Sequence, residues 1–490
     1  MTVRAIYPVT KRELIALMLA VFLLSLAGTL PAATQSGPAD KDGALASDKE
    51  IAVAIEKHLS EDRAVSSKKI TVDVKSGIAT LSGSVNNLLA KDRAGEAAET
   101  IRGVRSVVNT ITVNPVKRPD DEITKDAKSA LAQDPATDLY EAGVQVTNGA
   151  AILTGTVDSL AERELAGQVV KAVKGIKAVK NDLTVKPKLK RPDGEVAADI
   201  KGVLKQDPWV DAGSIDVDVK DGIATLKGTV GSLIERTSAI TDAWVAGVIR
   251  VDANDLTVKP GSTMTRTTKP VSDKEIKQLI ESAWSHHPRL SSFKPEVQSS
   301  QHIVTLTGAV DNLAAKKIAG EIAQSTTGVT RVENHIKVSP KKVAGDAALA
   351  REVKAALLRD PYVARFDMNV SASDSRILLE GKVDSTFEKN YAEFVASRVN
   401  GVGEVKNSLQ VVELEVPRKT DSAVQQQIEH GLRWSPFSDG KNIAVSVKDG
   451  IATLSGTASS WREKIAATQI AQKAGAESVL NQMKVKDQSS

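Results

Sequence analysis

The histidines are the residues of this sequence that could most readily hold a metal ion or move a proton. There are six of them in 490 residues, and cysteine is absent, which excludes thiolate ligands, cysteine nucleophiles, disulfides and an acylated cysteine. His286 and His287 are adjacent, but neighbouring residues on a helix rarely point the same way. No nucleophile elbow or paired-carboxylate motif occurs. We therefore predict no catalytic residue, no metal site and no cofactor, and we do not expect an enzyme.

Aromatic residues make up only 3% of the chain, and five of the large ones lie at the end of the opening helical stretch of their repeats or just beyond it. Three directly follow a proline just beyond a helical stretch, and two lie in the last turn of such a stretch. Tryptophan and tyrosine favour the lipid interface, where nearby arginines can meet phosphates. Two interpretations stay open: these side chains cap local cores, or they form a lip that dips into a phospholipid surface. The five are Trp209, Trp284, Tyr362, Trp434 and Phe437.

A glycine motif recurs along the chain, most clearly as Gly77-Ile-Ala-Thr-Leu-Ser-Gly83-Ser-Val85. The second glycine is present in all six copies. We expect it to act in packing, because the missing Cβ lets a helix approach the sheet or permits a bulge. No glycine-rich loop of the nucleotide-binding kind precedes a helix. These glycines are Gly83, Gly155, Gly228, Gly308, Gly381 and Gly456.

A second motif follows the first by about 20 residues each time, as in Gly103-Val104 with Val107 and Asn109. Two motifs in a fixed order, six times over, indicate tandem repeats. Proline- and lysine-rich joints, such as Lys186 to Pro192, separate the repeats and end their last strands. The predicted repeats span residues 46–114, 120–186, 193–259, 271–339, 346–412 and 419–486.

Each repeat has the pattern of helix, strand, strand, helix, strand. The opening helix carries one apolar stripe, as in Ile51, Ile55 and Leu59, and the first strand alternates between apolar and polar residues. We therefore predict an α+β fold of tandem two-layer modules, each with a three-stranded mixed sheet and two helices on one face. The turn glycine is missing near Gln301 and Ser375, so looser hairpins are expected in repeats 4 and 5.

The first 43 residues predict export. Arg4, Lys11 and Arg12 precede an apolar run over residues 14–30, which is typical of a signal peptide or of an uncleaved inner-membrane anchor. In both cases the rest of the chain enters the periplasm or cell envelope. The net charge of +4 gives no general attraction to nucleic acid, and we expect no nucleic-acid partner.

The alternating strand, the Asp-Gly turn, Ala-Thr-Leu-Ser-Gly-Thr-Val and Gly-Val-x-x-Val-x-Asn together resemble the BON (bacterial OsmY and nodulation) family. The resemblance covers the chain from about Ser47 to Lys486, in more copies than the usual one to three. It implies a periplasmic or envelope setting, tolerance of osmotic stress and binding to phospholipid membranes. We expect a non-enzymatic protein whose modules bind anionic phospholipid surfaces by multivalency. The alternative is a structural spacer or scaffold that binds other envelope proteins and no lipid. The oligomeric state is left open.

Overall fold

A computed structural model describes residues 46–485, except 66–68, 138–140, 189, 208–209, 261–271, 294, 327, 330, 341–344, 413–418, 439, 459–460 and 477. The predicted signal or anchor, with its apolar run over residues 14–30, lies outside the described residues. No helix in the part of the chain that is described has both the length and the apolar composition needed to cross a membrane.

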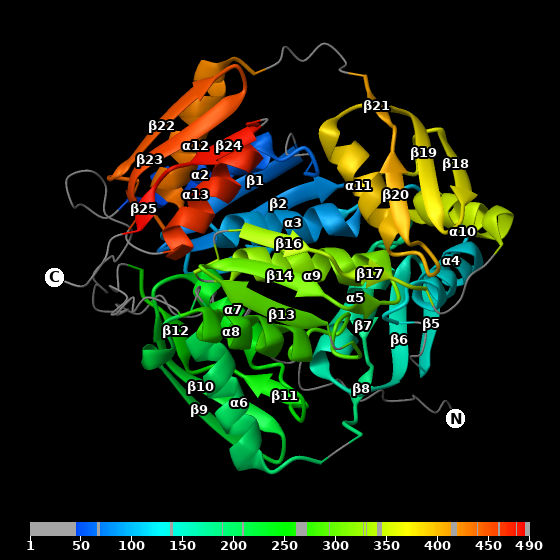
Figure 1. The fold of residues 1–490 in the computed structure, drawn as a ribbon, viewed down its shortest axis with the longest axis horizontal. Helices are drawn as coiled ribbons and strands as arrows, with labels where there is room; N and C mark the ends of the chain where they lie inside the picture. Colours follow the sequence, from blue (N-terminus) through cyan, green and yellow to red (C-terminus); the bar gives the residue numbers. More distant parts are fainter. Residues whose placement is uncertain are drawn as a thin grey trace, which may run out of the picture. The chain divides into compact units, whose positions relative to one another are not determined.

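The order helix, strand, strand, helix, split strand occurs six times (Figure 1). Repeat 1 comprises α2 (Asp48–Glu61), β1 (Ile70–Lys75), β2 (Ile78–Val85), α3 (Leu88–Glu99), β3 (Ser106–Asn109) and β4 (Thr112–Val113). Repeat 2 comprises α4 (Asp120–Gln133), β5 (Glu141–Thr147), β6 (Ala150–Val157), α5 (Leu160–Lys171), β7 (Ala178–Asn181) and β8 (Thr184–Val185). Repeat 3 comprises α6 (Asp193–Gln206), the 3-10 helix η2 (Ala212–Ser214), β9 (Ile215–Lys220), β10 (Ile223–Val230), α7 (Leu233–Asp242), β11 (Arg250–Asp252) and β12 (Leu256–Val258).

The remaining repeats keep the same order. Repeat 4 comprises α8 (Asp273–His286), β13 (Glu296–Ser300), β14 (Ile303–Thr307), β15 (Ala309–Val310), α9 (Leu313–Ser325), β16 (Arg331–Asn334) and β17 (Lys337–Val338). Repeat 5 comprises α10 (Asp346–Arg359), β18 (Met368–Ser373), β19 (Arg376–Val383), α11 (Thr386–Ser397), β20 (Glu404–Asn407) and β21 (Gln410–Val411). Repeat 6 comprises α12 (Asp421–Trp434), β22 (Ile443–Lys448), β23 (Ile451–Ala458), α13 (Trp461–Ala474), β24 (Ser478–Asn481) and β25 (Lys484–Val485).

The strands of each repeat pair around the second strand, antiparallel on one edge and parallel on the other. In repeat 4 this strand is divided into β14 and β15, and β15 pairs with β17 in a separate two-stranded sheet. In repeat 1, β2 pairs antiparallel with β1, from Ile70 opposite Gly83 to Lys75 opposite Ile78. On its other edge β2 pairs in parallel with β3 and then with β4. The third strand of the predicted module is therefore present, divided into two short segments. The predicted α+β module is confirmed.

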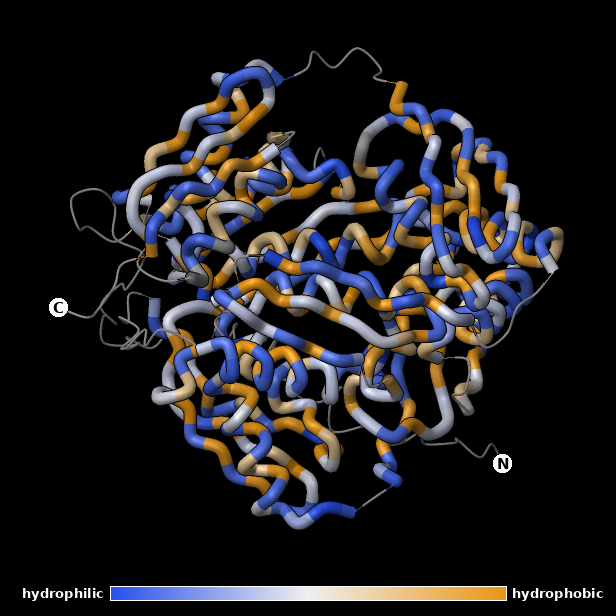
Figure 2. The backbone as a smooth tube through the Cα atoms, viewed as in Figure 1, coloured by the Kyte–Doolittle hydropathy of each residue, from blue (hydrophilic) through white to orange (hydrophobic). Residues whose placement is uncertain are grey.

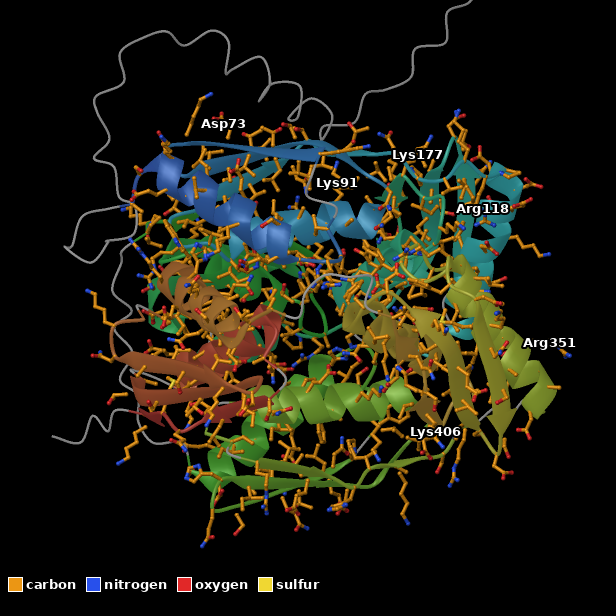
Figure 3. The ribbon with its side chains drawn as sticks, turned by 90° about the horizontal axis from the view of Figure 1, so that it is seen from above. Asp73, Lys91, Arg118, Lys177, Arg351 and Lys406 are labelled. Carbon is orange, nitrogen blue, oxygen red and sulfur yellow. The ribbon has the colours of Figure 1, made fainter. Side chains whose placement is uncertain are left out.

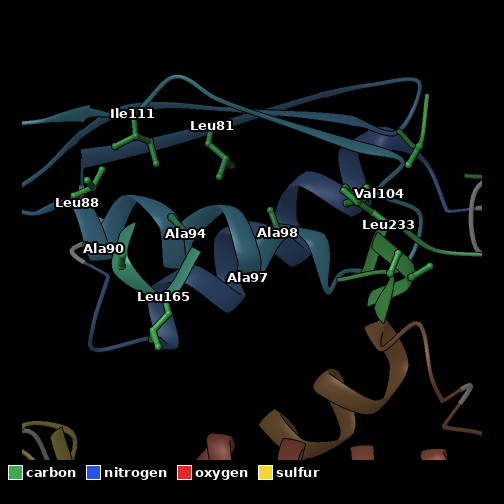
Figure 4. Close-up of a cluster of buried hydrophobic side chains, with 14 of the residues drawn as sticks. Leu81, Leu88, Ala90, Ala94, Ala97, Ala98, Val104, Ile111, Leu165 and Leu233 are labelled. Atoms are coloured by element: carbon green, nitrogen blue, oxygen red, sulfur yellow. The ribbon is translucent and has the colours of Figure 1, made fainter. Parts of the chain in front are cut away.

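The core of each repeat lies between the sheet and its two helices. Alternate residues of β2, such as Leu81, point toward α3, which presents small side chains such as Ala94 and Ala98 (Figure 4). Small residues on the helix let it approach the sheet closely. The other strand residues face away from the helices, so polar and apolar colours alternate along the strands (Figure 2). One face of each sheet is thus covered by its own helices, and the other is not.

The opening helices begin as the sequence predicts. Ser47 and Ser272 both form capping boxes with the glutamate three residues later, Glu50 and Glu275. The predicted apolar stripe is buried, since Ile51, Ile55 and Leu59 are all at most 1% exposed.

The hairpin turns of repeats 4 and 5 keep the backbone conformation of the other turns although the glycine is missing. Gln301 and His302 take the left-handed conformation, with φ of 50° and 63°, and Asp374 and Ser375 do the same, with φ of 51° and 63°. The turns with glycine have closely similar values, such as 51° for Ser76 and 74° for Gly77. The two turns therefore keep the shape of the others and accept a strain that glycine avoids.

Candidate interaction surfaces

Two of the five aromatic residues singled out from the sequence lie in the cores of their repeats. Trp284 is only 4% exposed and packs with Ile276 and Ile280. The half-buried ring of Tyr362 meets Phe387 and Tyr391 edge-on, with centroids 5.3 and 5.0 Å away. These positions agree with the interpretation in which the aromatic residues cap local cores.

Two others lie where repeat 6 meets repeat 1. Trp434 is half-buried and packs against the hydrophobic cluster that repeats 1 to 3 share. Its carbonyl oxygen accepts a hydrogen bond from the backbone N–H of Arg102, at 2.8 Å. Phe437 is also half-buried, and its N–H donates to Ser435 Oγ at 3.2 Å. Trp209 lies outside the described residues.

An aspartate at the first position of each opening helix holds the hairpin turn of the same repeat. In repeat 3 the carboxylate of Asp193 accepts the backbone N–H groups of Asp221 and Gly222, at 2.8 and 3.1 Å. The helix N-terminus also favours a negative charge there. The contact ties the helix to the tip of the sheet, and it recurs through Asp48, Asp120, Asp273 and Asp421. Asp346 of repeat 5 keeps one of the two bonds, from the N–H of Asp374.

The asparagine of the second motif ties the third strand to the second helix. In repeat 2, Asn181 Nδ2 donates to the carbonyl of Arg163 at 2.6 Å, and Asn181 Oδ1 accepts from the N–H of Leu183. Repeat 3 has Ala253 at this position, and there the guanidinium of Arg236 donates to the carbonyl oxygens of Ala253 and Leu256 instead. The same asparagine contact recurs at Asn109, Asn334, Asn407 and Asn481.

The glycines predicted to act in packing lie where two strands come close. Gly228 has a φ of +133°, and a Cβ there would lie 2.1 Å from the carbonyl oxygen of Ser214, just before the neighbouring strand. For Gly83 and Gly456 the corresponding distances, to the oxygens of Lys69 and Asn442, are 1.9 and 2.1 Å. The close neighbour is thus strand backbone rather than a helix, and a side chain at these positions would clash with it.

Repeats 2 and 5 contact each other through the ends of their opening helices. The N–H of Lys174 donates to the carbonyl of Arg359 at 2.7 Å, and the N–H of Asn400 donates to the carbonyl of Gln133 at 2.9 Å. Both donors stand just before the glycine of the Gly-Val turn, and both acceptors stand at the last position of the helix. A small cavity of about 70 Å³ remains between the two repeats.

A buried ionic cluster joins three repeats at this contact. Asp134 of repeat 2 is 4% exposed and accepts two hydrogen bonds of 2.7 Å from the guanidinium of Arg289 in repeat 4. Arg398 of repeat 5 donates to the same carboxylate at 2.8 and 3.1 Å. Burial alone would raise the pKa of Asp134, but the charges of Arg398 and Arg289 outweigh it and lower the pKa to about 2.

The corresponding aspartate of repeat 5 is held mainly by backbone groups. Asp360 is 4% exposed and accepts backbone hydrogen bonds from Tyr362 and Val363. Burial raises its pKa to about 7, although these hydrogen bonds and one from Tyr391 act in the opposite direction. One carboxyl group of this contact is therefore firmly ionised, and the other titrates near neutrality.

Repeats 1 and 6 make the same kind of contact. Besides the backbone bond to Trp434, the guanidinium of Arg102 donates to the carbonyl oxygens of Ser435, at 2.8 and 3.1 Å, and of Ser438. Between α2 and α12 lies a cavity of about 290 Å³, lined by residues that include Val53 and Arg433. This contact leaves more unfilled space than the one between repeats 2 and 5.

The sheet faces turned away from the helices differ in chemistry between repeats. In repeat 3 this face alternates in charge, with Asp216 and Asp218 beside Lys220 and Lys227. In repeat 1, Asp73 projects away from the sheet and pairs with Lys75 (Figure 3). Repeat 6 is different, because its strand residues on this face are apolar, hydroxyl-bearing or basic. They are Ala444, Ser446, Lys448, Ile451, Thr453, Ser455, Thr457, Ser478, Leu480 and Lys484.

Of the histidines, His58 and His430 come close to each other where repeat 1 meets repeat 6. No group of three or more histidine, aspartate or glutamate side chains in that part of the chain could hold a metal ion. Burial, with Arg289 nearby, lowers the pKa of His287 to about 4, and burial, with Lys57 and other basic neighbours, lowers the pKa of His430 to about 4. Both imidazoles are therefore neutral at pH 7.

Sequence reasoning missed two sets of residues. The aspartates that hold the turns could have been found, because an aspartate stands at the same place in all six repeats, 28 residues before the turn. The arginines that join repeats had no such signal. Arg102, Arg289 and Arg398 act singly, and the carbonyls or carboxylates that they meet lie 155 to 336 residues away.

Comparison with known proteins identifies the repeats. The BON domain family model matches six segments, residues 47–115, 119–187, 192–260, 272–340, 345–413 and 420–487. The chain is 34% identical over 157 residues to the osmotically-inducible protein Y of Escherichia coli, covering 31% of this chain and 78% of that protein. It is 32% identical over 106 residues to the outer membrane lipoprotein DolP of Haemophilus influenzae, covering 21% of this chain and 54% of that protein.

A solved structure is also similar over part of the chain. The C-terminal domain of CdsD, a structural protein of the Type III secretion system of Chlamydia trachomatis, matches 40% of this chain and 93% of its own length. The sequence identity is 16% and the TM-score is 0.12. At that level the likeness indicates neither a shared function nor a shared arrangement of domains.

Proposed function

Because the chain belongs to the BON domain family, with six copies of the domain, we propose that it is a non-enzymatic, exported protein of the cell envelope that binds phospholipid surfaces. We further propose that it supports envelope integrity under osmotic stress. Two relatives support this setting, since one is an osmotically inducible protein and the other an outer membrane lipoprotein. The apolar run over residues 14–30 supports export, with a cleaved signal or a retained inner-membrane anchor as its two possible outcomes.

The open sheet face of repeat 6 is the observation that carries the lipid proposal. Ile451 and Leu480 are 46% and 49% exposed there, although isoleucine and leucine are usually buried. Lys448 and Lys484 lie on the same face, and none of its described strand residues is acidic. Apolar side chains flanked by lysines fit a membrane interface that carries anionic headgroups.

The aromatic side chains have a smaller part in this proposal. Trp284 is buried and is left out of it. Contact of Trp209, Tyr362, Trp434 or Phe437 with lipid stays a prediction, and the half-buried positions of Tyr362, Trp434 and Phe437 leave only part of each ring free to make it. The other function that the sequence left open is an elongated spacer. The contacts of repeat 1 with repeat 6, and of repeat 2 with repeat 5, do not suit a spacer whose repeats touch only their neighbours.

The test is co-sedimentation of the exported chain with vesicles of neutral phospholipid, and with vesicles that contain anionic phospholipid, at low and high salt. We expect binding to the anionic vesicles and weaker binding at high salt, because the lysines act through screened charge. Leu480→Glu should reduce that binding about tenfold or more, since it removes apolar contact and adds repulsion. Leu480→Lys should retain most of it.

The fold gives reason to expect that both variants are tolerated. The position of Leu480 is occupied by Glu333 in repeat 4 and by Lys406 in repeat 5, on strands of the same register. Ile223→Glu is the matched control, because Ile223 of repeat 3 stands where Ile451 stands in repeat 6, but on the charged face. Equal binding by Leu480→Glu and the control would exclude the repeat 6 face. No binding of the unaltered chain to either vesicle would exclude the lipid function and favour a scaffold for other envelope proteins.

A further inference from the structure

The contact between repeats 2 and 5 has an internal twofold relationship. Adding 226 to a residue number in repeat 2 gives the equivalent residue in repeat 5, as for Gln133 and Arg359, whose side chains also hydrogen-bond to each other. Under this exchange the bond from Lys174 N–H to the Arg359 carbonyl becomes the bond from Asn400 N–H to the Gln133 carbonyl. Each repeat therefore presents the same donor and the same acceptor to the other.

The residues that line the cavity at this contact follow the same twofold relationship. Repeat 2 lines it with Ala130, Gln133, Asp134, Val169, Ala172 and Val173, and repeat 5 lines it with the six residues whose numbers are 226 higher. A surface that pairs with its own equivalent is what homodimers with a twofold axis use. Here it is used between two repeats of one chain.

The same surface is used again by repeats 1 and 6. Arg102 is the counterpart of Lys174, and Trp434 is the counterpart of Arg359, so the bond from Arg102 N–H to the Trp434 carbonyl reproduces the first bond of the other pair. The opening helices of repeats 3 and 4, α6 and α8, also pack together, as α4 and α10 do. The contacts of the opening helices thus join repeat 1 with 6, 2 with 5 and 3 with 4. Other contacts join repeat 1 with 2 and repeat 4 with 5, such as the ion pairs of Lys171 with Asp92 and of Lys317 with Glu393.

The outermost pair is the one least fixed by other contacts. Repeat 6 has a hydrophobic cluster of its own, whereas repeats 1 to 3 share a single cluster. The cavity of about 290 Å³ beside α12 is larger than the one of about 70 Å³ between repeats 2 and 5. The contact combines the packing of Trp434 with hydrogen bonds from Arg102 to the carbonyl oxygens of Ser435 and Ser438, and the chain has no cysteine that could lock it.

We propose that the end of the opening helix and the Gly-Val turn of each repeat form a docking surface for a second BON repeat, and that repeat 6 exchanges between copies of the chain. In the exchanged state, repeat 1 of one copy holds repeat 6 of a second copy through the contacts now made within one chain. Domain swapping of this kind needs no new interface. The inference is independent of lipid binding.

The absence of cysteine makes a direct test possible in the full chain. Val53 is 55% exposed, Arg433 is also exposed, and both line the cavity between α2 and α12. One preparation carries Val53→Cys and the other Arg433→Cys. The two are mixed at high concentration, partly opened in mild urea, returned to buffer and treated with a short bis-maleimide. We expect covalent dimers in which the thiol introduced by Val53→Cys in one copy is joined to the thiol introduced by Arg433→Cys in the other, together with a dimer mass by light scattering.

Two controls separate exchange from collision and from a general loss of structure. A mixture of the Val53→Cys chain with a Lys220→Cys chain, which places the second thiol on an exposed strand of repeat 3, should give few dimers. Arg102→Ala in both partners should lower the urea concentration at which the specific cross-link appears, because exchange must first open this contact and charged hydrogen bonds to two carbonyls are lost. Arg105→Ala, three residues away and exposed, should leave that concentration unchanged. Equal yields from both thiol pairs, no effect of Arg102→Ala, or no dimers at any concentration would each overturn the proposal.

Discussion

Asp134 and Asp360 occupy equivalent positions on the two sides of one contact, 226 residues apart, and their pKa values move in opposite directions. Arg398 and Arg289 hold Asp134 ionised, and its pKa is about 2. Position 172 of repeat 2, the counterpart of Arg398, is an alanine. Burial therefore dominates at Asp360, and its pKa is about 7. The backbone contacts of repeats 2 and 5 are thus symmetrical, but the charges around their two aspartates are not.

Asp134→Asn should destabilise the protein markedly. The change leaves Arg289 and Arg398 beside a neutral amide in a buried place, and losing one partner of a buried ion pair costs about 3–5 kcal/mol. Urea unfolding measured at pH 7 checks this. Asp73→Asn is the control, since Asp73 pairs with Lys75 where both side chains are more than half exposed, and its loss should change stability by less than about 1 kcal/mol.

Asp360→Asn should change how stability depends on pH. A carboxyl group whose pKa is raised on folding from 3.8 to about 7 contributes stability below pH 3.8, and that contribution is lost as the pH rises through about 7. The unaltered protein should therefore lose stability, relative to Asp360→Asn, between about pH 4 and pH 7. Melting temperatures of the two proteins at pH 4.5, 6 and 8 test this. A constant difference across this range would contradict a titrating Asp360.

The same measurement on Asp134→Asn should show no pH dependence between pH 4.5 and pH 8. The pKa of Asp134 is lowered on folding, so its contribution is present above pH 3.8 and is lost only as the pH falls toward 2. The cost of Asp134→Asn should accordingly stay constant from pH 4.5 to pH 8.

Asp193→Ala should loosen the hairpin of repeat 3. It removes an acceptor for the N–H groups of Asp221 and Gly222 and a favourable charge at the start of α6, for a loss of about 2 kcal/mol. Hydrogen exchange should show faster exchange of the Asp221 and Gly222 amides. Asp216→Ala, on the exposed side of β9, should leave both amides unchanged.

Two glycines of repeat 3 should respond oppositely to alanine. Gly228→Ala places a Cβ against the Ser214 carbonyl at a φ of +133°, so it should destabilise the repeat by several kcal/mol. Gly202 lies within α6 with nothing inside 4 Å of an added Cβ, and Gly202→Ala should stabilise the protein by about 1 kcal/mol. Chemical unfolding of both variants measures the contrast.

The sequence predicts the repeated fold because the signals for it are local and occur six times. The strand alternation, the turn and the two glycine motifs each lie within a few residues of their partners, and the α+β modules appear as expected. Trp284 shows that local spacing also predicts which side chains are buried. It stands four residues after Ile280, which stands four after Ile276, and this spacing places all three on the buried face of α8. Trp434 stands two residues after the buried Leu432, about 200° further round the helix, so it lies off the buried stripe of α12 and reaches another repeat.

The contacts between repeats could not be predicted in this way. Arg102 meets the carbonyl oxygens of Ser435 and Ser438, and main-chain carbonyls carry no residue identity that a motif could reveal. The ionic cluster of Asp134 needs one residue from each of three repeats. An aspartate follows the opening helix in repeats 1, 3 and 5 as well, but the two arginines of the cluster, from repeats 4 and 5, donate to Asp134. A single copy of such a feature gives no periodicity, and only the folded arrangement brings its members together.

Because the first repeat pairs with the last, the contact between them can form only at the end of synthesis. Arg102 is synthesised 333 residues before Ser435, and at about 5–20 residues per second the ribosome needs tens of seconds to supply its partner. Repeats 3 and 4 can pair soon after they emerge, whereas repeat 1 waits through the synthesis of every other repeat with its docking surface uncovered. Copies that are exported close together expose that surface at the same time, so the closing step competes with pairing between chains until the sixth repeat is complete.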